Sequence, residues 1–206
     1  MSDYQDYGYH SDAITHNFSY MLQPLLKMLE KNKNQCILDL GCGNGYLVNH
    51  LLSLGYNVYG TDASEKGIAI ANKINPGRFF VQDLSTGKLP PELQKFSFDT
   101  IISTEVIEHL YDPEGFIDFC KQALSKNGEL IISTPYHGYL KNLVLSLTNK
   151  WDQHLNPVWH GGHIKMWSKR TLSNLLEIKG FTVTQFEGCG RMPYIWKSML
   201  IKARLN

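Results

Sequence analysis

Two carboxylates and an imidazole stand close together in the run Glu105-Val106-Ile107-Glu108-His109. Side chains three and four positions apart share one face of a helix, so Glu105, Glu108 and His109 would converge if this turn is helical. Such groups repel or shift one another's pKa unless a cation or proton intervenes. A divalent ion there would order them, polarise an acceptor hydroxyl and lower its pKa. Mixed oxygen and nitrogen ligands suit magnesium, manganese or zinc.

The same turn has two interpretations without a metal. His109 is also a candidate general base that removes a proton from the acceptor. Alternatively, the three residues only shape a turn after a strand. A fourth metal ligand could come from the run Gly161–Trp167, which contains His163. His160, directly before this run, is an equally near candidate.

A glycine-rich turn is the second chemical feature. Asp39 precedes Gly41, Gly43 and Gly45, and an apolar helical pattern follows them. Glycine allows positive φ and lets the backbone approach a ligand closely, and the helix that follows directs free N–H groups towards that ligand. The spacing G-x-G-x-G differs from the G-x-G-x-x-G of dinucleotide-binding loops, and the turn lacks the lysine of a nucleotide-triphosphatase loop.

Strands and helices alternate along most of the chain, and the strands are continuously apolar. This pattern predicts an α/β fold with a mostly parallel sheet covered on both faces. We expect one domain, 1–206, with an N-terminal helical cap at 1–34 and a substrate-recognition insert at 135–167. Pro24 should kink or divide the first helix. The expected strands are 36–40, 57–62, 78–83, 98–103, 130–134, 181–187 and 195–203; the expected helices are 12–29, 47–54, 64–73, 113–124, 140–147 and 168–178.

Acidic residues end two of these strands: Asp62 ends the second and Asp83 the third. In open α/β sheets, ligands bind outside the carboxyl ends of the strands. The glycine turn, the two aspartates and the Glu105 turn should therefore surround one crevice.

The run Asp39-Leu40-Gly41-Cys42-Gly43-Asn44-Gly45 resembles motif I of class I S-adenosylmethionine-dependent methyltransferases. The resemblance implies a Rossmann-like, doubly wound, seven-stranded sheet with an inserted lid, and S-adenosylmethionine as cofactor. It also implies that Asp62 bonds the ribose hydroxyls and that Asp83 faces the adenine amino group. The implied cofactor-binding residues are Asp39, Gly41, Gly43, Gly45, Asp62 and Asp83. An alternative for Glu105 is that it only hydrogen-bonds near the methionine moiety of the cofactor.

Glu105–Leu110, followed by a histidine before a helix, resembles two methyltransferase groups. These are the ubiquinone-biosynthesis O-methyltransferases and the small-RNA 3′-terminal 2′-O-methyltransferases. Both imply an acceptor with two adjacent hydroxyls, catalytic roles for Glu105 and His109, and a metal site of Glu105, Glu108, His109 and His163. Residues 190–199 are closer to the quinone-type enzymes, so a small aromatic or quinol-like acceptor is expected. The alternatives are an RNA ribose, an NAD-dependent oxidoreductase and a non-catalytic cofactor-binding subunit.

Composition limits the partners. The net charge is +1, so no global basic field favours long nucleic acid. The four cysteines lack C-x-x-C pairs, the N-terminus is polar and acidic, and no apolar run spans a bilayer, so we expect a cytoplasmic protein of unpredicted oligomeric state.

The insert has three features that point to an acceptor. It is locally basic, which suits an anionic substrate or an RNA end, and its amphipathic 139–147 stretch could meet a membrane. Its aromatic residues either stack on a flat acceptor or form the core of a lid. The basic residues are Lys141, Lys150, Lys165, Lys169 and Arg170; the aromatic residues are Tyr136, Tyr139, Trp151, Trp159 and Trp167. Tyr7, Tyr9 and His10 are likewise candidates to fold over the cofactor.

Overall fold

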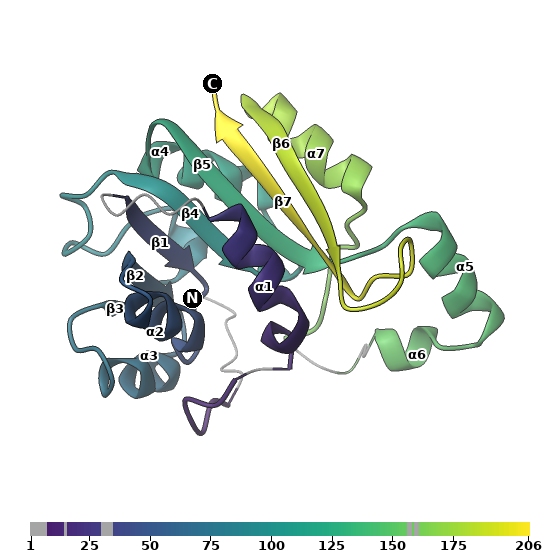
Figure 1. Cartoon of the computed structure of the whole chain (residues 1–206), viewed down its shortest axis with the longest axis horizontal. Helices are drawn as coiled ribbons and strands as arrows, with labels where there is room; N and C mark the ends of the chain where they lie inside the picture. Colours follow the sequence, from purple (N-terminus) through teal and green to yellow (C-terminus); the bar gives the residue numbers. More distant parts are fainter. Residues whose placement is uncertain (1–7, 15, 30–34, 156–157, 159–160) are drawn as a thin grey trace.

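A seven-stranded sheet forms the centre of the computed structural model, which describes residues 8–14, 16–29, 35–155, 158 and 161–206 (Figure 1). The strand order is β3-β2-β1-β4-β5-β7-β6, and only β7 runs antiparallel to its neighbours in this described sheet. This is the predicted Rossmann-like, mostly parallel sheet. The strands are β1 (Cys36–Leu40), β2 (Asn57–Asp62), β3 (Phe79–Val81), β4 (Phe98–Thr104), β5 (Leu124–Pro135), β6 (Phe181–Cys189) and β7 (Ser198–Leu205).

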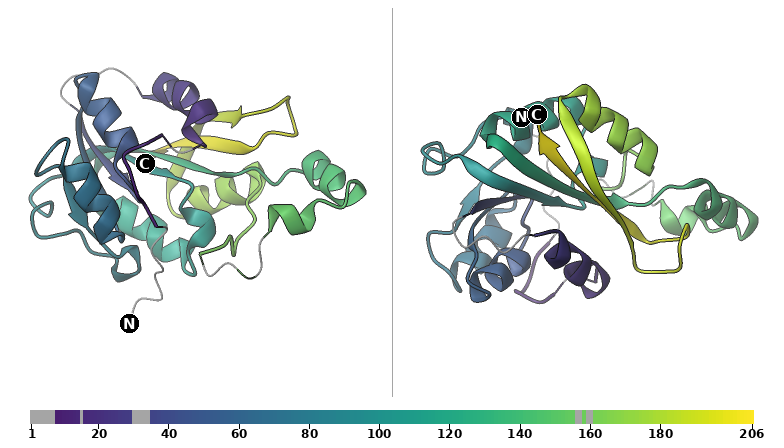
Figure 2. Two further views of the ribbon diagram at one scale, coloured as in Figure 1. Left: turned by 90° about the horizontal axis from the view of Figure 1, so that it is seen from below. Right: turned by 45° about the horizontal axis from the view of Figure 1, so that its top comes forward.

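Helices cover both faces of the sheet (Figure 2). On one face lie α1 (Phe18–Met28), α2 (Tyr46–Ser53) and α3 (Glu65–Asn72), and on the other lie α4 (Pro113–Ala123) and α7 (Lys169–Ile178). Each face of the sheet has its own hydrophobic core. Neighbouring residues of β1 contribute to different cores: Ile37 packs with α1, α2 and α3, and Leu38 packs with α4 and α7. Burial on both faces explains why the strands are apolar at nearly every position.

The N-terminal helix differs from the expectation. It begins at Phe18 rather than near Asp12, and it is not divided at Pro24. The side-chain amide of Asn44 donates to the backbone carbonyls of Ser11 and Ala13 at 2.9 Å, which holds the preceding segment out of a helix. The predicted cap therefore consists of α1, packed on β6 and β7, and an irregular stretch that crosses the glycine turn.

The insert contains two helices, α5 (Tyr139–Leu147) and α6 (Trp151–His154), which project beyond the sheet next to the β6–β7 hairpin (Figure 1). The first was predicted, and the second was expected to be loop. Two short 3₁₀ helices, η1 (Leu84–Thr86) and η2 (Ile107–His109), follow β3 and β4. Among the described residues, no helix is both long and apolar enough to cross a membrane.

Candidate functional site

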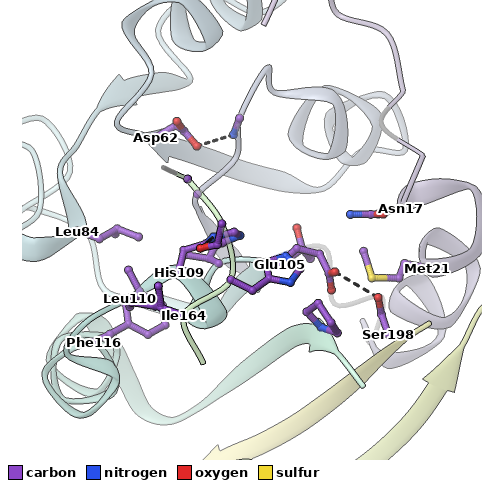
Figure 3. A pocket seen from close by; sticks show the side chains of 18 of the residues that line it. Asn17, Met21, Asp62, Leu84, Glu105, His109, Leu110, Phe116, Ile164 and Ser198 are labelled. Atoms are coloured by element: carbon purple, nitrogen blue, oxygen red, sulfur yellow. Dashed lines mark hydrogen bonds between the residues drawn. The ribbon is translucent and has the colours of Figure 1, made fainter. Parts of the chain in front are cut away.

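A cavity of about 1880 Å³ opens at the carboxyl ends of β1, β2 and β4 (Figure 3). Here the chain leaves β1 and β4 side by side, and a Cβ placed on Gly41 would overlap the Val106 side chain. Only glycine permits this approach of the two loops, and Gly41 has a φ of +82°. The volume exceeds the 300–1,000 Å³ or so of a typical single-ligand pocket, so it has room for two ligands.

The glycine turn and the end of β2 form one wall of this cavity. Asp62 accepts hydrogen bonds from Gly43 N and from Ser64 N, both at 2.8 Å, and its side chain faces the cavity (Figure 3). A carboxylate fixed in this way at the cavity wall is an acceptor suited to a ligand hydroxyl. Asp83 also lines the cavity, and its Oδ1 accepts from Ser85 N at 2.9 Å.

Tyr9 covers the same turn. Its hydroxyl would lie 2.5 Å from a Cβ on Gly43, so a side chain at that position would displace it. Tyr9 is half-buried and lines the cavity, which fits the prediction that this segment folds over the cofactor. Tyr7, named in the same prediction, lies outside the described residues.

Two predicted cofactor residues lie behind the wall rather than on it. Asp39 is 1% exposed, and burial together with Asp62 raises the pKa of its carboxyl to about 8. Gly45 has a φ of +76°, directly precedes α2, and lies close to Ala71 and Phe79. Asp39 and Gly45 therefore support the turn, whereas Gly41 and Gly43 line the cavity.

The turn after β4 is not an α-helix, and this corrects the predicted convergence of Glu105, Glu108 and His109. Glu105 has a left-handed backbone with a φ of +55°, and η2 begins only at Ile107. Its carboxylate accepts hydrogen bonds from the hydroxyls of Ser133 at 2.8 Å and Ser198 at 3.2 Å, so it turns towards β5 and β7 (Figure 3). Burial raises its pKa to about 7, although both serine hydroxyls lower it.

Glu108, His109 and His163 do come together. One ligand atom from each lies within 4.8 Å of the others, and the rings of His109 and His163 meet edge to face at 4.9 Å. Ligands of one zinc or magnesium ion are at most about 4 Å apart, so this group is slightly expanded. The Glu108 carbonyl accepts from Ile164 N and Lys165 N at 2.9 and 3.0 Å, which holds the His163 segment in place.

The chemistry of this group fits a divalent cation. Glu108 is 1% exposed. Its carboxylate lies near the Thr134 hydroxyl and its own backbone N–H, which lower its pKa, but neither carboxylate oxygen has a well-formed hydrogen bond within the described chain. Burial, reinforced by Glu105, raises the pKa of Glu108 well above its usual value. Burial lowers the pKa of His109 and takes that of His163 to about 4, so both rings are neutral, as ligands must be. His109 and His163 line the cavity, and Glu108 lies behind them.

A backbone carbonyl orients His109. Its Nδ1 lies 3.1 Å from Gly162 O, and its Nε2 lies 3.9 Å from Glu108 Oε1. This contact favours a proton on Nδ1 and presents Nε2 as the electron-pair donor, the arrangement common to histidines that bind metals. His160, the alternative fourth ligand, lies outside the described residues.

The aromatic residues of the insert mostly pack against protein. Tyr136 meets Trp196 edge to face at 5.1 Å, Trp151 stacks on His137 at 6.4 Å, and Trp167 joins the core under α7. Tyr139 is 85% exposed and lies outside the cavity lining. Trp159 is not among the described residues. Trp151 therefore packs within the insert, as the lid-core interpretation expects, whereas Trp167 belongs to the main core. Neither lines the cavity, and stacking on an acceptor stays a prediction.

Several residues that line the cavity or position its side chains were not predicted. Ser133 and Ser198 position Glu105, Asn44 holds the N-terminal segment, and Arg191 adds a positive charge. The sequence offered a signal only for Ser133, which follows the apolar run of β5 at the carboxyl edge of the sheet.

Comparisons with known proteins agree with this geometry. A family described as a methyltransferase domain matches residues 13–186. The ubiquinone biosynthesis O-methyltransferase of Pelagibacter ubique is 30% identical over 61% of this chain and 57% of its own length. The mitochondrial ubiquinone biosynthesis O-methyltransferase of Homo sapiens is 31% identical over 77% of this chain and 44% of its own length. The chain thus spans about half the length of these curated relatives.

Solved structures show the same fold. The magnesium protoporphyrin IX methyltransferase of Synechocystis PCC 6803 with bound SAH aligns with a TM-score of 0.68 at 21% identity, covering 90% of this chain and 82% of that one. The chain belongs to the methyltransferase domain family and is a class I S-adenosylmethionine-dependent methyltransferase that resembles the ubiquinone-biosynthesis O-methyltransferases.

Proposed function

We propose that this enzyme methylates one of two adjacent hydroxyls on a small, aromatic or quinol-like acceptor, with a divalent cation held by Glu108, His109 and His163. The observation that carries the proposal is the buried Glu108 carboxylate, which lacks a well-formed hydrogen bond in the described chain and faces two neutral imidazoles. A carboxylate in such a place needs a cation or a proton. Magnesium, manganese and zinc all suit the mixed ligands.

In this proposal the donor end of the cavity holds S-adenosylmethionine. The Asp62 carboxylate, already fixed by two backbone N–H groups, accepts from the ribose hydroxyls. Asp83, which lines the same part of the cavity, would face the adenine, and Gly41 and Gly43 would let the backbone approach the ligand. Methyl transfer from a sulfonium is an in-line displacement, so this positioning supplies much of the acceleration.

The acceptor end must supply a deprotonated hydroxyl. A cation bound there polarises an acceptor hydroxyl and lowers its pKa. Two adjacent hydroxyls chelate a cation better than one, which supports a diol. Glu105, predicted to be catalytic and to bind the metal, has a different role here: its carboxylate, held by Ser133 and Ser198, faces the cavity between the two ends. The Glu105 carboxylate would bind the cationic methionine end of S-adenosylmethionine.

Product analysis on a matched acceptor panel tests this function. Catechol, a quinol, phenol and a short RNA with a terminal ribose diol are each incubated with S-adenosylmethionine, with and without added divalent ions. We expect ion-dependent methylation of the diols and none of phenol. Methylation of phenol at the same rate would overturn the diol requirement, and turnover of the RNA alone would favour the ribose alternative.

The remaining alternatives respond to the same panel. Family membership excludes an NAD-dependent oxidoreductase. A non-catalytic subunit would bind S-adenosylhomocysteine but turn over no acceptor.

The four cysteines are free, which supports the predicted reducing, cytoplasmic location.

Contact of residues 139–147 with a membrane stays a prediction, which sedimentation with lipid vesicles measures. The exposed apolar side chains that support it are Tyr139, Leu140, Leu143, Val144 and Leu147.

A further inference from the structure

The two ends of the cavity differ in charge. The donor end, formed by the loops after β2 and β3 and before α4, is acidic through Asp62, Asp83 and Asp112. The opposite end is formed by the α5–α6 insert and the β6–β7 hairpin, and its formal charges are positive. Its basic lining residues are Lys141, Lys150, Arg191 and Lys197.

Lys141 is the centre of the basic end. It lies on α5, is 5% exposed, and lines the cavity. Its Nζ donates one hydrogen bond, to Lys197 O at 3.1 Å. In the described structure no carboxylate lies within ion-pair distance of this ammonium. A buried ammonium with one of three donors used is costly to the fold, and such groups are rare unless they are paired.

The surroundings of Lys141 add positive charge. Burial and the nearby Arg191 guanidinium together lower its pKa to about 8. The pKa of His154 is lowered by burial first and then by Lys141 and Arg191. Glu105 is the acid that acts on Lys141 in the other direction, but its carboxylate is bonded to Ser133 and Ser198. Glu105 therefore offsets this charge only from outside ion-pair distance, and the Lys141 ammonium has no direct carboxylate partner among the described residues.

We propose that Lys141, with Arg191, forms a subsite for an anionic oxygen group of the acceptor, either a carboxylate or a phosphate. This inference rests on the proposed function, since it names a second chemical feature of the same acceptor. The diol lies at Glu108, His109 and His163, and the anionic group lies towards α5. An oxyanion supplies the acceptors that the buried ammonium lacks, and charge-assisted hydrogen bonds of this kind are the strong ones.

Matched neutral and anionic diols test the subsite directly. The probes are 3,4-dihydroxybenzamide, 3,4-dihydroxybenzoate and 3,4-dihydroxybenzyl phosphate, titrated calorimetrically into protein saturated with S-adenosylhomocysteine. We expect at least one anionic probe to bind about tenfold or more tightly than the amide. Lys141→Met should abolish that preference, and Lys126→Met, an exposed lysine outside the cavity, should retain it.

A second measurement separates a ligand site from a structural lysine. Lys141→Gln, which loses the buried charge but can still donate to Lys197 O, should have an unchanged or higher unfolding temperature. A clear decrease would mark Lys141 as structural and overturn the proposal. Lys141→Gln removes the charge but keeps a donor for Lys197 O, so its loss of the anionic preference must match that of the methionine variant.

The outcomes also distinguish this proposal from the proposed function. Equal binding of the amide and both anions, or no binding of any probe, overturns the subsite even if catechol is methylated. Lys141-dependent preference for an anion supports the subsite even if no diol is turned over. A short RNA that displaces the benzoate and is methylated in its place would overturn the assignment to a small acceptor.

Discussion

The donor end and the acceptor end of the cavity are built in different ways. The donor end uses backbone N–H groups, glycines and aspartates that follow neighbouring strands, β1, β2 and β3. The acceptor end is assembled from side chains of the turn after β4, the insert and the β6–β7 hairpin, which lie far apart in the sequence. The first end can therefore act without the second, and substitutions should separate cofactor binding from turnover.

The largest effect is expected at the acceptor end. Glu108→Gln keeps the shape of the side chain but removes the charge that a divalent ion requires. We expect turnover to fall by about 100-fold or more, because a bound cation contributes several kcal/mol to charge stabilisation. The affinity for S-adenosylhomocysteine, measured by calorimetry, should stay within about twofold.

Glu105→Gln is the matched control for that substitution. Glu105 lies on the same turn but is bonded to two serines and stands apart from the three ligands. Ion affinity should therefore be retained in Glu105→Gln and lost in Glu108→Gln. Equal loss in both variants would mean that the three-residue group is not the ion site.

Asp62→Ala should give the next largest effect, at the donor end. Loss of charge-assisted hydrogen bonds should weaken S-adenosylhomocysteine binding by about 1–3 kcal/mol. Turnover at saturating cofactor should change much less. Unchanged affinity would remove the ribose-binding role of Asp62.

Asp39 gives a pH test of the support behind the donor end. Its pKa is raised from 3.8 to about 8 by burial and by Asp62. The folded state therefore holds a proton that the unfolded state loses, so the unfolding free energy falls as pH rises between these two values. Asp39→Asn should flatten this dependence and raise the unfolding temperature by about 2–4 °C at pH 8. An identical pH profile in thermal melts of both proteins would contradict the buried, uncompensated carboxyl.

The smallest effect is expected from Asn44→Ala. The substitution removes two hydrogen bonds that hold the Tyr9 segment over the glycine turn. We expect about a threefold faster release of S-adenosylhomocysteine in stopped-flow measurements, because the segment opens more often. An unchanged release rate would mean that Tyr9 does not cover the cofactor.

The same contrast explains what could be read from the sequence. The sheet, its covered faces and the glycine turn follow from local patterns, because apolar runs and glycines report backbone conformation directly. Asp62 was found for the same reason, as it ends a strand. The association of Glu108 and His109 with His163 was predicted through the family resemblance, and the structure brings these three together.

What the sequence did not show depends on tertiary contacts. Glu105 was misplaced because a helical turn was assumed, whereas its backbone is left-handed and two serines from other strands fix its carboxylate. The start of α1 was misplaced because Asn44, far along the chain, holds the preceding segment. Lys141 was read only as part of a basic region, since burial of one lysine on a short helix leaves no local pattern.

Chelation tests the division between the two ends most directly. Methylation of catechol and binding of S-adenosylhomocysteine are measured before and after exhaustive removal of divalent ions, and again after magnesium, manganese or zinc is restored. We predict that turnover is lost and recovered while cofactor affinity stays constant. Full turnover in the chelated protein would contradict a divalent cation at Glu108, His109 and His163.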